Sequence, residues 1–293
     1  MKKIIITGAS GFLGHHIVKA LLKRGDTNII AILGKPGDKS NVLPQDERLK
    51  VYPCSSLHDI EFSHVDTLIH TAFSRGEDLK GLTLSLDMTK NVIELVNKKD
   101  VDSIINISSQ GIYKSLRPGE TVDENGEIEP NTTYGLAKRA VENMLELCCR
   151  KRYTSIRMAS LGSNAGFLNF FVESIMDGKD ICVTAPHQYA SIMDVSDAVS
   201  GILSVENLPL TKRDSVYNLG PGNQYSILDY AETANRIGKN NEFLPVKINV
   251  NDKGGDFAIC MDCEKIKKQT CWKPLLTKEM MIQKMYEQKT KKQ

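Results

Sequence analysis

The most informative stretch of the sequence reads Ile4-Ile5-Ile6-Thr7-Gly8-Ala9-Ser10-Gly11-Phe12-Leu13-Gly14. Three branched apolar residues in a row are typical of a strand buried on both faces of a parallel sheet. The apolar pattern that begins at Phe12 has helical spacing. A strand, a glycine turn and a helix start together form an anion site, because unpaired N–H groups and the positive end of the helix dipole attract phosphate.

The three glycines suit the pyrophosphate of a dinucleotide. Gly8 permits a tight turn, Gly11 lets the backbone approach the phosphates, and Gly14 lets helix and strand pack closely. The first glycine gap is one residue wider than in the usual fingerprint. A turn without a ligand is the alternative, and the place between strand and helix favours the dinucleotide. We predict cofactor contacts from this turn, namely Gly8, Ser10, Gly11, Phe12, Leu13 and Gly14.

Length and composition restrict the class of protein. The 293 residues are 41% hydrophobic and 25% charged, as in a soluble protein with one large or two smaller domains. The net charge of +2 gives no electrostatic basis for a nucleic acid or membrane partner. No apolar run approaches the roughly 18 residues that span a bilayer, and Met1-Lys2-Lys3 leads into a strand rather than a secretory signal. We therefore expect a cytoplasmic protein.

The number of cysteines also agrees with a cytoplasmic protein. There are seven, an odd number in a long chain, which favours free thiols in a reducing cytosol. Cys260 and Cys263 have the first half of a zinc spacing, and Cys271 lies nearby. Structural zinc needs four ligands, and no fourth follows at a matching interval. We predict no metal site.

Strands and helices alternate along the first half of the chain, which predicts an α/β fold with a doubly wound parallel sheet of the Rossmann type. The further predicted strands are Asn28–Leu33, Leu49–Tyr52, Asp66–His70 and Asp102–Ser108, with a helix over Leu84–Asn97. Ligands of such sheets lie beyond the carboxyl ends of the strands. Ala72 and Ser109 should therefore line the site, Ala72 on the cofactor side.

From Leu161 the chain leaves the sheet, which predicts a second domain. We expect residues 1–160 plus 191–220 to form the dinucleotide-binding domain. Residues 161–190 plus 221–293 should form a smaller α/β carboxy-terminal lobe that binds substrate.

A second informative stretch, Tyr134-Gly135-Leu136-Ala137-Lys138, opens a predicted helix. Tyr134 and Lys138 are four residues apart, so both side chains leave one helix face. A nearby ammonium favours phenolate and lowers the tyrosine pKa towards the working pH, as a general acid–base requires. Packing of a tyrosine on a lysine stem is the alternative. It is disfavoured because the pair follows both the glycine turn and a strand ending in Ser108-Ser109.

The residue that follows the second strand bears on the choice of cofactor. A carboxylate about 20 residues after the last glycine would hold the adenosine ribose of NAD. This chain has Gly34 and Lys35 there, with Lys39 nearby. A lysine attracts a 2′-phosphate, so Lys35 favours NADP over NAD, although a surface lysine is also common in such loops.

Together these residues resemble the extended short-chain dehydrogenase/reductase family, in particular its NAD-dependent epimerase/dehydratase branch, which acts on nucleotide sugars. The resemblance covers nearly the whole chain. Its motifs are Thr7–Gly14, Asp66–Ala72, Ile107–Tyr113, Tyr134-x-x-x-Lys138, Val195–Ala198, Val216–Gly220 and Gly254-Gly255-Asp256 leading to Asp262.

The resemblance implies a role for each site residue. Ser109 would hydrogen-bond the reacting oxygen, with Ser108 as a weaker candidate that also lies by the cofactor. Tyr134 would transfer the hydroxyl proton, and Lys138 would bind the nicotinamide ribose and keep the tyrosine pKa low. The implied substrate contacts are Ser109, Gln110, Tyr113, Asn164 and Lys253.

Departures from the family pattern refine the function. Dehydratases carry an Asp-Glu pair where this chain has Gln110 and Gly111, which disfavours loss of water. Ala190 and Lys253 replace arginines that often bind the sugar diphosphate, and lysine lacks the bidentate fork of arginine. A nucleotide-sugar epimerase or reductase is the leading hypothesis.

Two other functions stay open. One is a reductase of a small aldehyde or ketone, a function that Lys35 and Ala190 would suit. The other is a protein that senses NAD(P) without turnover. The presence of Ser109, Tyr134 and Lys138 argues against it, because a sensor does not need groups for proton transfer. The resemblance also implies a homodimer through the helices Leu84–Asn97 and Tyr134–Arg150.

Overall fold

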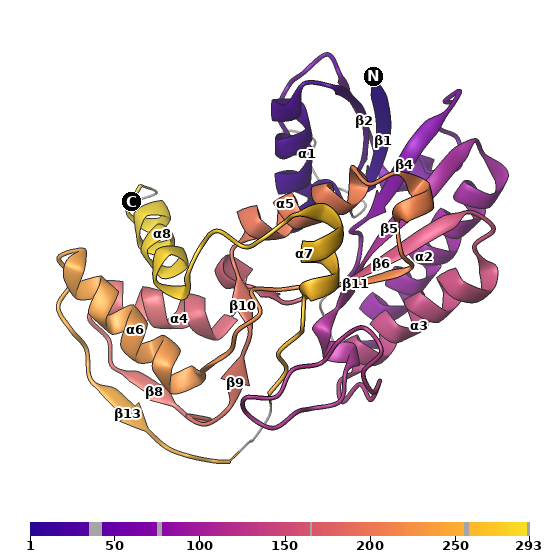
Figure 1. Ribbon diagram of the computed structural model, residues 1–293. Coiled ribbons are helices and arrows are strands. Elements are labelled where there is room, and N and C mark those ends of the chain that lie inside the picture. The colour runs from indigo at the N-terminus through magenta and orange to yellow at the C-terminus, as the bar shows by residue number, and fades with distance from the viewer. Residues whose placement is uncertain (35–42, 75–77, 165, 255–257, 292–293) are drawn as a thin grey trace. The chain divides into compact units, whose positions relative to one another are not determined.

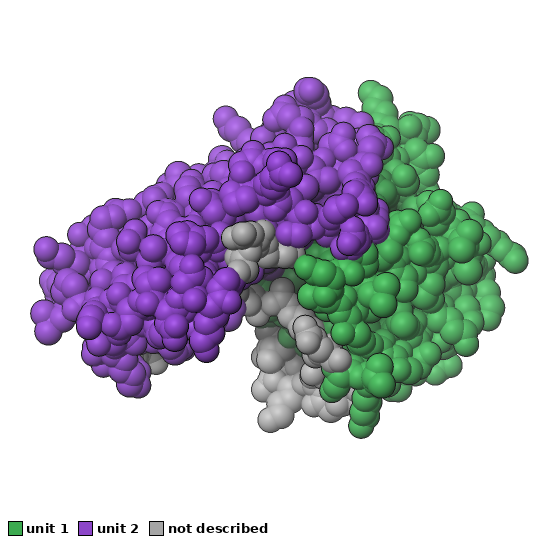
Figure 2. Space-filling view, turned by 90° about the horizontal axis from the view of Figure 1, so that it is seen from below, with its two compact units in different colours: residues 1–112, 130–157, 202–217 green, residues 113–129, 158–201, 218–293 purple. Residues whose placement is uncertain are grey.

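The computed structural model describes residues 1–34, 43–74, 78–164, 166–254 and 258–291. It divides into two compact units (Figure 2). Unit 1 comprises residues 1–112, 130–157 and 202–217, and unit 2 comprises residues 113–129, 158–201 and 218–293. The predicted division differs mainly at 113–129 and 191–201, which group with unit 2. One reason is that Ile192–Met193 pairs with Ser160–Leu161.

A seven-stranded sheet forms the frame of unit 1, in the order β3-β2-β1-β4-β5-β6-β11. Pairing is parallel between β1 and β2, β1 and β4, β2 and β3, and β4 and β5. The strands are β1 Lys2–Thr7, β2 Thr27–Ile32, β3 Leu49–Tyr52, β4 Val65–His70, β5 Val101–Ser109, β6 Arg152–Met158 and β11 Val216–Leu219. The predicted doubly wound Rossmann sheet is confirmed. Its strand order reverses between β1 and β4, where such sheets bind ligands.

Helices cover both faces of this sheet. Helices α2 (Leu79–Lys98) and α3 (Thr133–Cys148) lie side by side on one face, and α1 (Phe12–Arg24) lies on the other (Figure 1). Ile4, Ile5 and Ile6 of β1 are completely buried, as expected for a strand enclosed on both faces. The predicted strands thus occur close to their predicted bounds, whereas α2 begins at Leu79 and not at the predicted Leu84.

Unit 2 combines short strand pairs with helices. Strand β7 (Ser160–Leu161) pairs with β10 (Ile192–Met193), β8 (Ile181–Val183) with β13 (Ile248–Val250), and β9 (Tyr189–Ala190) with β12 (Tyr225–Ser226). The helices are α4 Gly166–Met176, α6 Ile227–Asn240, α7 Glu264–Thr270 and α8 Lys278–Thr290, while α5 Val195–Glu206 belongs to both units. Short 3-10 turns are η2 Cys54–Ser56, η3 Gln110–Ile112, η4 Gly162–Asn164 and η5 Leu210–Lys212. The core of unit 2 includes Phe171, Tyr230 and Tyr286 from α4, α6 and α8.

Two further findings concern the whole described chain. Every cysteine is a free thiol, and burial raises the pKa of Cys263 to about 12, which makes this thiol unreactive. Within the described residues, none of the helices combines the length and apolar character needed to cross a bilayer.

Candidate active site

The glycine turn after β1 lies against the segment after β4. Gly8 has a φ of +72°, and a Cβ on it would lie 2.7 Å from the backbone nitrogen of Ala72. The Thr71 hydroxyl donates to the carbonyl of Thr7 at 2.7 Å. Both the left-handed backbone and the close approach require glycine. The turn and Ala72 therefore meet where the strand order reverses.

The other glycines bring α1 onto this turn. A Cβ on Gly14 would lie 2.2 Å from the Gly8 carbonyl oxygen, and the Gly11 N–H donates to the same oxygen at 2.9 Å. Gly11 is the N-cap of α1; as far as the chain is described, no side chain caps this end and no acid occupies its first turn. The positive end of the helix dipole thus faces the turn without a competing carboxylate.

Ser10 ties the turn to the end of β2. Its hydroxyl oxygen accepts a hydrogen bond from the Gly34 N–H at 2.9 Å. Lys35, the next residue and the predicted 2′-phosphate contact, lies outside the described residues. The preference for NADP therefore stays a prediction.

Tyr134 and Lys138 occupy the first turns of α3. The Thr132 hydroxyl caps this helix by accepting from the Gly135 N–H at 3.0 Å. A Cβ on Gly135 would lie 2.2 Å from the carbonyl oxygen of Gly111. This close packing sets the start of α3 against η3, directly after β5 ends at Ser109. Sequence reasoning did not identify the role of Gly135.

The Lys138 ammonium is buried between strand ends. Its Nζ donates to the carbonyl of Ile107 at 2.7 Å, and the residue is only 4% exposed. Nζ also lies 3.8 Å from the centre of the Phe73 ring. That ring packs edge-to-face on Tyr134, with ring centres 5.6 Å apart. Phe73 is a neighbour of the pair that the motifs did not single out.

The two candidate serines differ in orientation. The buried Ser108 hydroxyl donates to Glu142 Oε1 at 2.6 Å. The hydroxyl oxygen of Ser109 accepts from the Gly111 N–H at 3.1 Å, and the residue is half-buried. Ser109 is therefore the better placed of the two for a reacting oxygen, and Ser108 belongs to a buried network.

Glu142 is the centre of that network. Arg157 donates to it through Nε at 3.1 Å and through a terminal nitrogen at 2.9 Å, and Arg139 adds a bond of 3.1 Å. Glu142 and Arg157 are each 4% exposed. A carboxylate buried in this way is held in place by paired, charge-assisted hydrogen bonds. Sequence reasoning missed Glu142, although it lies one helical turn after Lys138.

His70, at the end of β4, is buried. Its Nδ1 lies 2.6 Å from the Thr7 hydroxyl and its Nε2 lies 3.0 Å from the Thr89 hydroxyl. Burial, and then the charge of Lys138, lower the pKa of His70 to about 3. The neutral ring thus joins β4 to β1 and α2.

We expect His70 to make the protein sensitive to acid. The pKa of His70 is lower in the folded than in the unfolded chain. The neutral ring therefore contributes fully to the stability of the fold above pH 6.5, and this contribution is lost progressively as the pH falls towards 3. Between pH 6.5 and 5 the free energy of unfolding should fall by about 2 kcal/mol through this residue. Denaturant unfolding across this range should show a smaller fall in His70→Gln. Parallel curves for the two proteins would contradict the prediction.

The other predicted substrate residues are distributed over both units. Gln110 opens η3 in unit 1. Tyr113, in unit 2, is 1% exposed and donates its hydroxyl proton to Asn218 at 2.7 Å. A substrate contact through its side chain is therefore not supported, because the ring is part of the interior. Lys253 is exposed, and its N–H donates to the Thr184 carbonyl just after β8. Asn164 ends η4, and its side chain lies outside the description.

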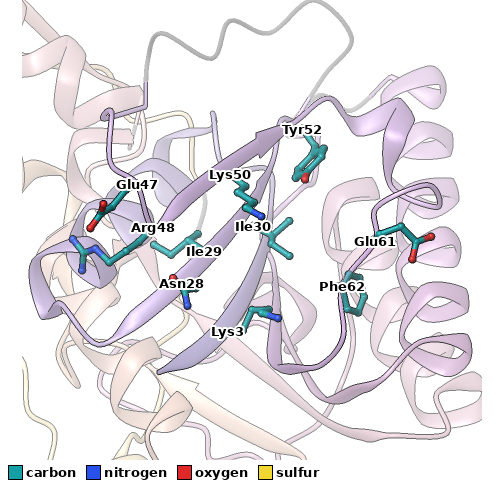
Figure 3. Close-up of a pocket in the computed structure, with 10 residues that line it drawn as sticks. All are labelled: Lys3, Asn28, Ile29, Ile30, Glu47, Arg48, Lys50, Tyr52, Glu61 and Phe62. Atoms are coloured by element: carbon teal, nitrogen blue, oxygen red, sulfur yellow. The ribbon is translucent and has the colours of Figure 1, made fainter.

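Unit 1 also has a hollow of about 230 Å³ on β1, β2 and β3 (Figure 3). Its lining combines side chains of both charges with apolar and aromatic ones, including Lys3, Glu47, Lys50, Glu61 and Phe62. Among the predicted site residues that the structure describes, none lines it. This hollow is therefore separate from the glycine turn and the Tyr-Lys pair.

Comparison with known proteins agrees with this arrangement. Residues 4–220 match the model of the NAD dependent epimerase/dehydratase family. A candidate UDP-glucose 4-epimerase of Methanocaldococcus jannaschii is 25% identical over 291 residues, covering 92% of this chain and 93% of that protein. The UDP-glucose 4-epimerase of Lactobacillus helveticus is 21% identical, covering 93% and 92%.

Solved structures share the fold over nearly the full length. UDP-glucose 4-epimerase of Thermotoga maritima with UDP-glucose has a TM-score of 0.80 at 21% identity, covering 98% of this chain and 99% of that one. UDP-glucuronic acid 4-epimerase of Bacillus cereus, in complex with UDP-glucuronic acid and NAD, has a TM-score of 0.82 at 18% identity, covering 99% and 100%. With the family match spanning most of the sequence, we conclude that this chain belongs to the NAD-dependent epimerase/dehydratase family and is an enzyme of the extended short-chain dehydrogenase/reductase type.

Proposed function

We propose that this protein epimerises a nucleotide sugar with NAD or NADP, using Tyr134 for proton transfer. The observation that carries the proposal is the placement of Tyr134 and Lys138. Gly135 packs the start of their helix onto η3, next to Ser109, and Lys138 bonds to the end of β5. A phenol, an ammonium and a serine hydroxyl thus gather near the carboxyl edge of the sheet, where ligands of this fold bind.

The glycine turn fits a dinucleotide. The absence of Cβ atoms at Gly8 and Gly14 lets strand, turn and helix approach closely, and the uncapped start of α1 suits a phosphate. Gly8, Ser10, Gly11, Phe12, Leu13 and Gly14 would hold the pyrophosphate, with Ala72 and Ser108 nearby and Lys138 on the nicotinamide ribose. The bound cofactor supplies hydride transfer. NAD is supported by the family and by NAD-bound relatives, and Lys35 is the reason to compare NADP.

The chain's own residues would manage the proton and the geometry. Tyr134, as phenolate, takes the proton from a sugar hydroxyl and returns it after the sugar has turned over. Lys138 stabilises the phenolate, and Ser109 donates a hydrogen bond to the reacting oxygen. Such positioned proton transfer contributes about 10²–10⁴-fold to rate.

UDP-sugars are the first substrates to test, because named relatives act on or bind them. In unit 2 the exposed ammonium of Lys253 is proposed to attract the diphosphate. The homodimer through α2 and α3 stays a prediction; Leu84, Leu136 and Leu147 on these helices are exposed.

The decisive assay mixes the protein with NAD and UDP-glucose, UDP-galactose or UDP-glucuronic acid, and follows the sugar protons by NMR. We expect interconversion of two epimers without net change in cofactor oxidation state. In D₂O the sugar C–H should keep its hydrogen, because the hydrogen moves as hydride and does not exchange with solvent. The same assay with NADP tests the cofactor preference.

Two results would contradict this function. Deuterium entering the sugar carbon would exclude the hydride route. No conversion of UDP-, dTDP-, GDP- or CDP-hexoses, together with oxidation of NADPH by small aldehydes or ketones, would favour the reductase. Titration calorimetry with UDP, dTDP, GDP and CDP identifies the preferred base independently of turnover.

A further inference from the structure

We propose that Phe73 is a positioning residue, which holds the Lys138 ammonium and the Tyr134 ring in a fixed arrangement. This role rests on the proposed function, in which Tyr134 transfers a proton. Its evidence is the geometry of unit 1 alone.

Three distances define the arrangement. Lys138 Nζ lies 3.8 Å from the centre of the Phe73 ring and 5.7 Å from the centre of the Tyr134 ring. The two ring centres are 5.6 Å apart, and the ring planes meet at 86°. Phe73 therefore contacts both members of the Tyr-Lys pair, in a cation–π geometry with one and an edge-to-face geometry with the other.

An aromatic ring has the right chemistry for this place. Lys138 is nearly fully buried, so its ammonium has lost most of its hydration. The negative face of the Phe73 ring attracts the ammonium without carrying a formal charge. A carboxylate there would neutralise the ammonium and reduce its effect on the phenol. Glu142, the carboxylate one turn further along α3, is instead held by Arg157 and Arg139.

The ring is also anchored by rigid backbone. Phe73 follows Ala72, whose backbone lies so close to Gly8 that no Cβ fits between them. On its other side the ammonium is held by the carbonyl of Ile107, in β5. The segment after β4, packed against the glycine turn, thus holds the ring, and the neighbouring strand β5 holds the ammonium. Closely packed backbone of this kind is what a precise site requires. The position of Phe73 also connects the cofactor turn to the proton-transfer pair.

Three variants test this role. Phe73→Leu removes the ring and keeps an apolar side chain, and Phe73→Tyr keeps the ring. Phe62→Leu is the matched control, because Phe62 and Phe73 both pack against the core cluster that includes Leu68 and Val92, while Phe62 lines the separate hollow (Figure 3). The first measurement is an NMR titration of isotope-labelled lysines, with the Lys138 signals assigned through Lys138→Arg. The second is the pH profile of kcat/KM.

We expect ring-current shifts at the Lys138 side chain in the unaltered protein. Phe73→Leu should reduce them to the smaller contribution of the Tyr134 ring, and should lower the titration midpoint of Lys138 by about one pH unit, the order of a desolvated cation–π contact. In the same variant kcat/KM at pH 7 should fall about tenfold and recover at higher pH, because a loosely held ammonium stabilises the phenolate less. Phe73→Tyr and Phe62→Leu should behave like the unaltered protein in both measurements.

Unchanged Lys138 signals in Phe73→Leu would overturn the proposal, whatever the activity. An unchanged pH profile would overturn it as well, and so would an equal effect of Phe62→Leu, which would indicate general loss of packing. Absence of turnover in the unaltered protein would refute the proposed function, and the lysine titration would then decide on Phe73 by itself.

Discussion

Replacing Tyr134 with phenylalanine should lower kcat by about 10²–10⁴-fold, the range typical of a positioned general acid–base. The variant keeps the aromatic ring and its edge-to-face packing on Phe73, so α3 and the cofactor turn should be preserved. The dissociation constant for NAD should therefore stay within about threefold of the original, since only interactions made in the transition state are lost. Steady-state kinetics and titration calorimetry measure the two quantities.

Tyr153→Phe provides the matched control. Tyr153 lies on β6 of the same unit and packs against the core, and burial raises the pKa of its phenol, so it is unsuited to proton transfer. This variant should retain nearly full turnover. Full activity in Tyr134→Phe would remove the proton-transfer role, and an equal loss in both variants would point to damaged folding.

The second large effect concerns stability. Glu142→Ala should lower the free energy of unfolding by about 3–5 kcal/mol, because it leaves the buried guanidinium of Arg157 without its carboxylate. The Ser108 hydroxyl loses its acceptor in the same change. For a protein whose total stability is of the order of 5–15 kcal/mol, such a loss is readily measured by urea unfolding.

Glu146→Ala is the control for this prediction. Glu146 lies one turn further along α3 and is exposed, so its loss should change stability by no more than about 0.5 kcal/mol. The double variant Glu142→Leu with Arg157→Leu should recover much of the lost stability, because the buried guanidinium is then removed together with its carboxylate partner. Equal effects of Glu142→Ala and Glu146→Ala would show that the network contributes little.

Local patterns in the sequence were sufficient for the frame and for part of the site. The isoleucine run of β1, the glycine turn and the four-residue spacing of Tyr134 and Lys138 depend on neighbours along the chain, and these elements occur where they were predicted. Tyr113 was a different case. Its motif suggested a substrate contact, but its hydroxyl bonds to Asn218, 105 residues later in the sequence, and no local pattern reports such a partner.

The sequence by itself determined the parallel sheet, the phosphate-binding turn and a phenol and an ammonium on one helix face, because each follows from residue type and short-range periodicity. Only the tertiary structure decided which groups surround that pair. Phe73 reaches the pair from the segment after β4. Glu142 accepts the hydrogen bond of the Ser108 hydroxyl, which leaves Ser109 as the serine better placed for a reacting oxygen. These contacts join residues that are far apart in the sequence, and the packing of strands against helices, rather than any local pattern, brings them together.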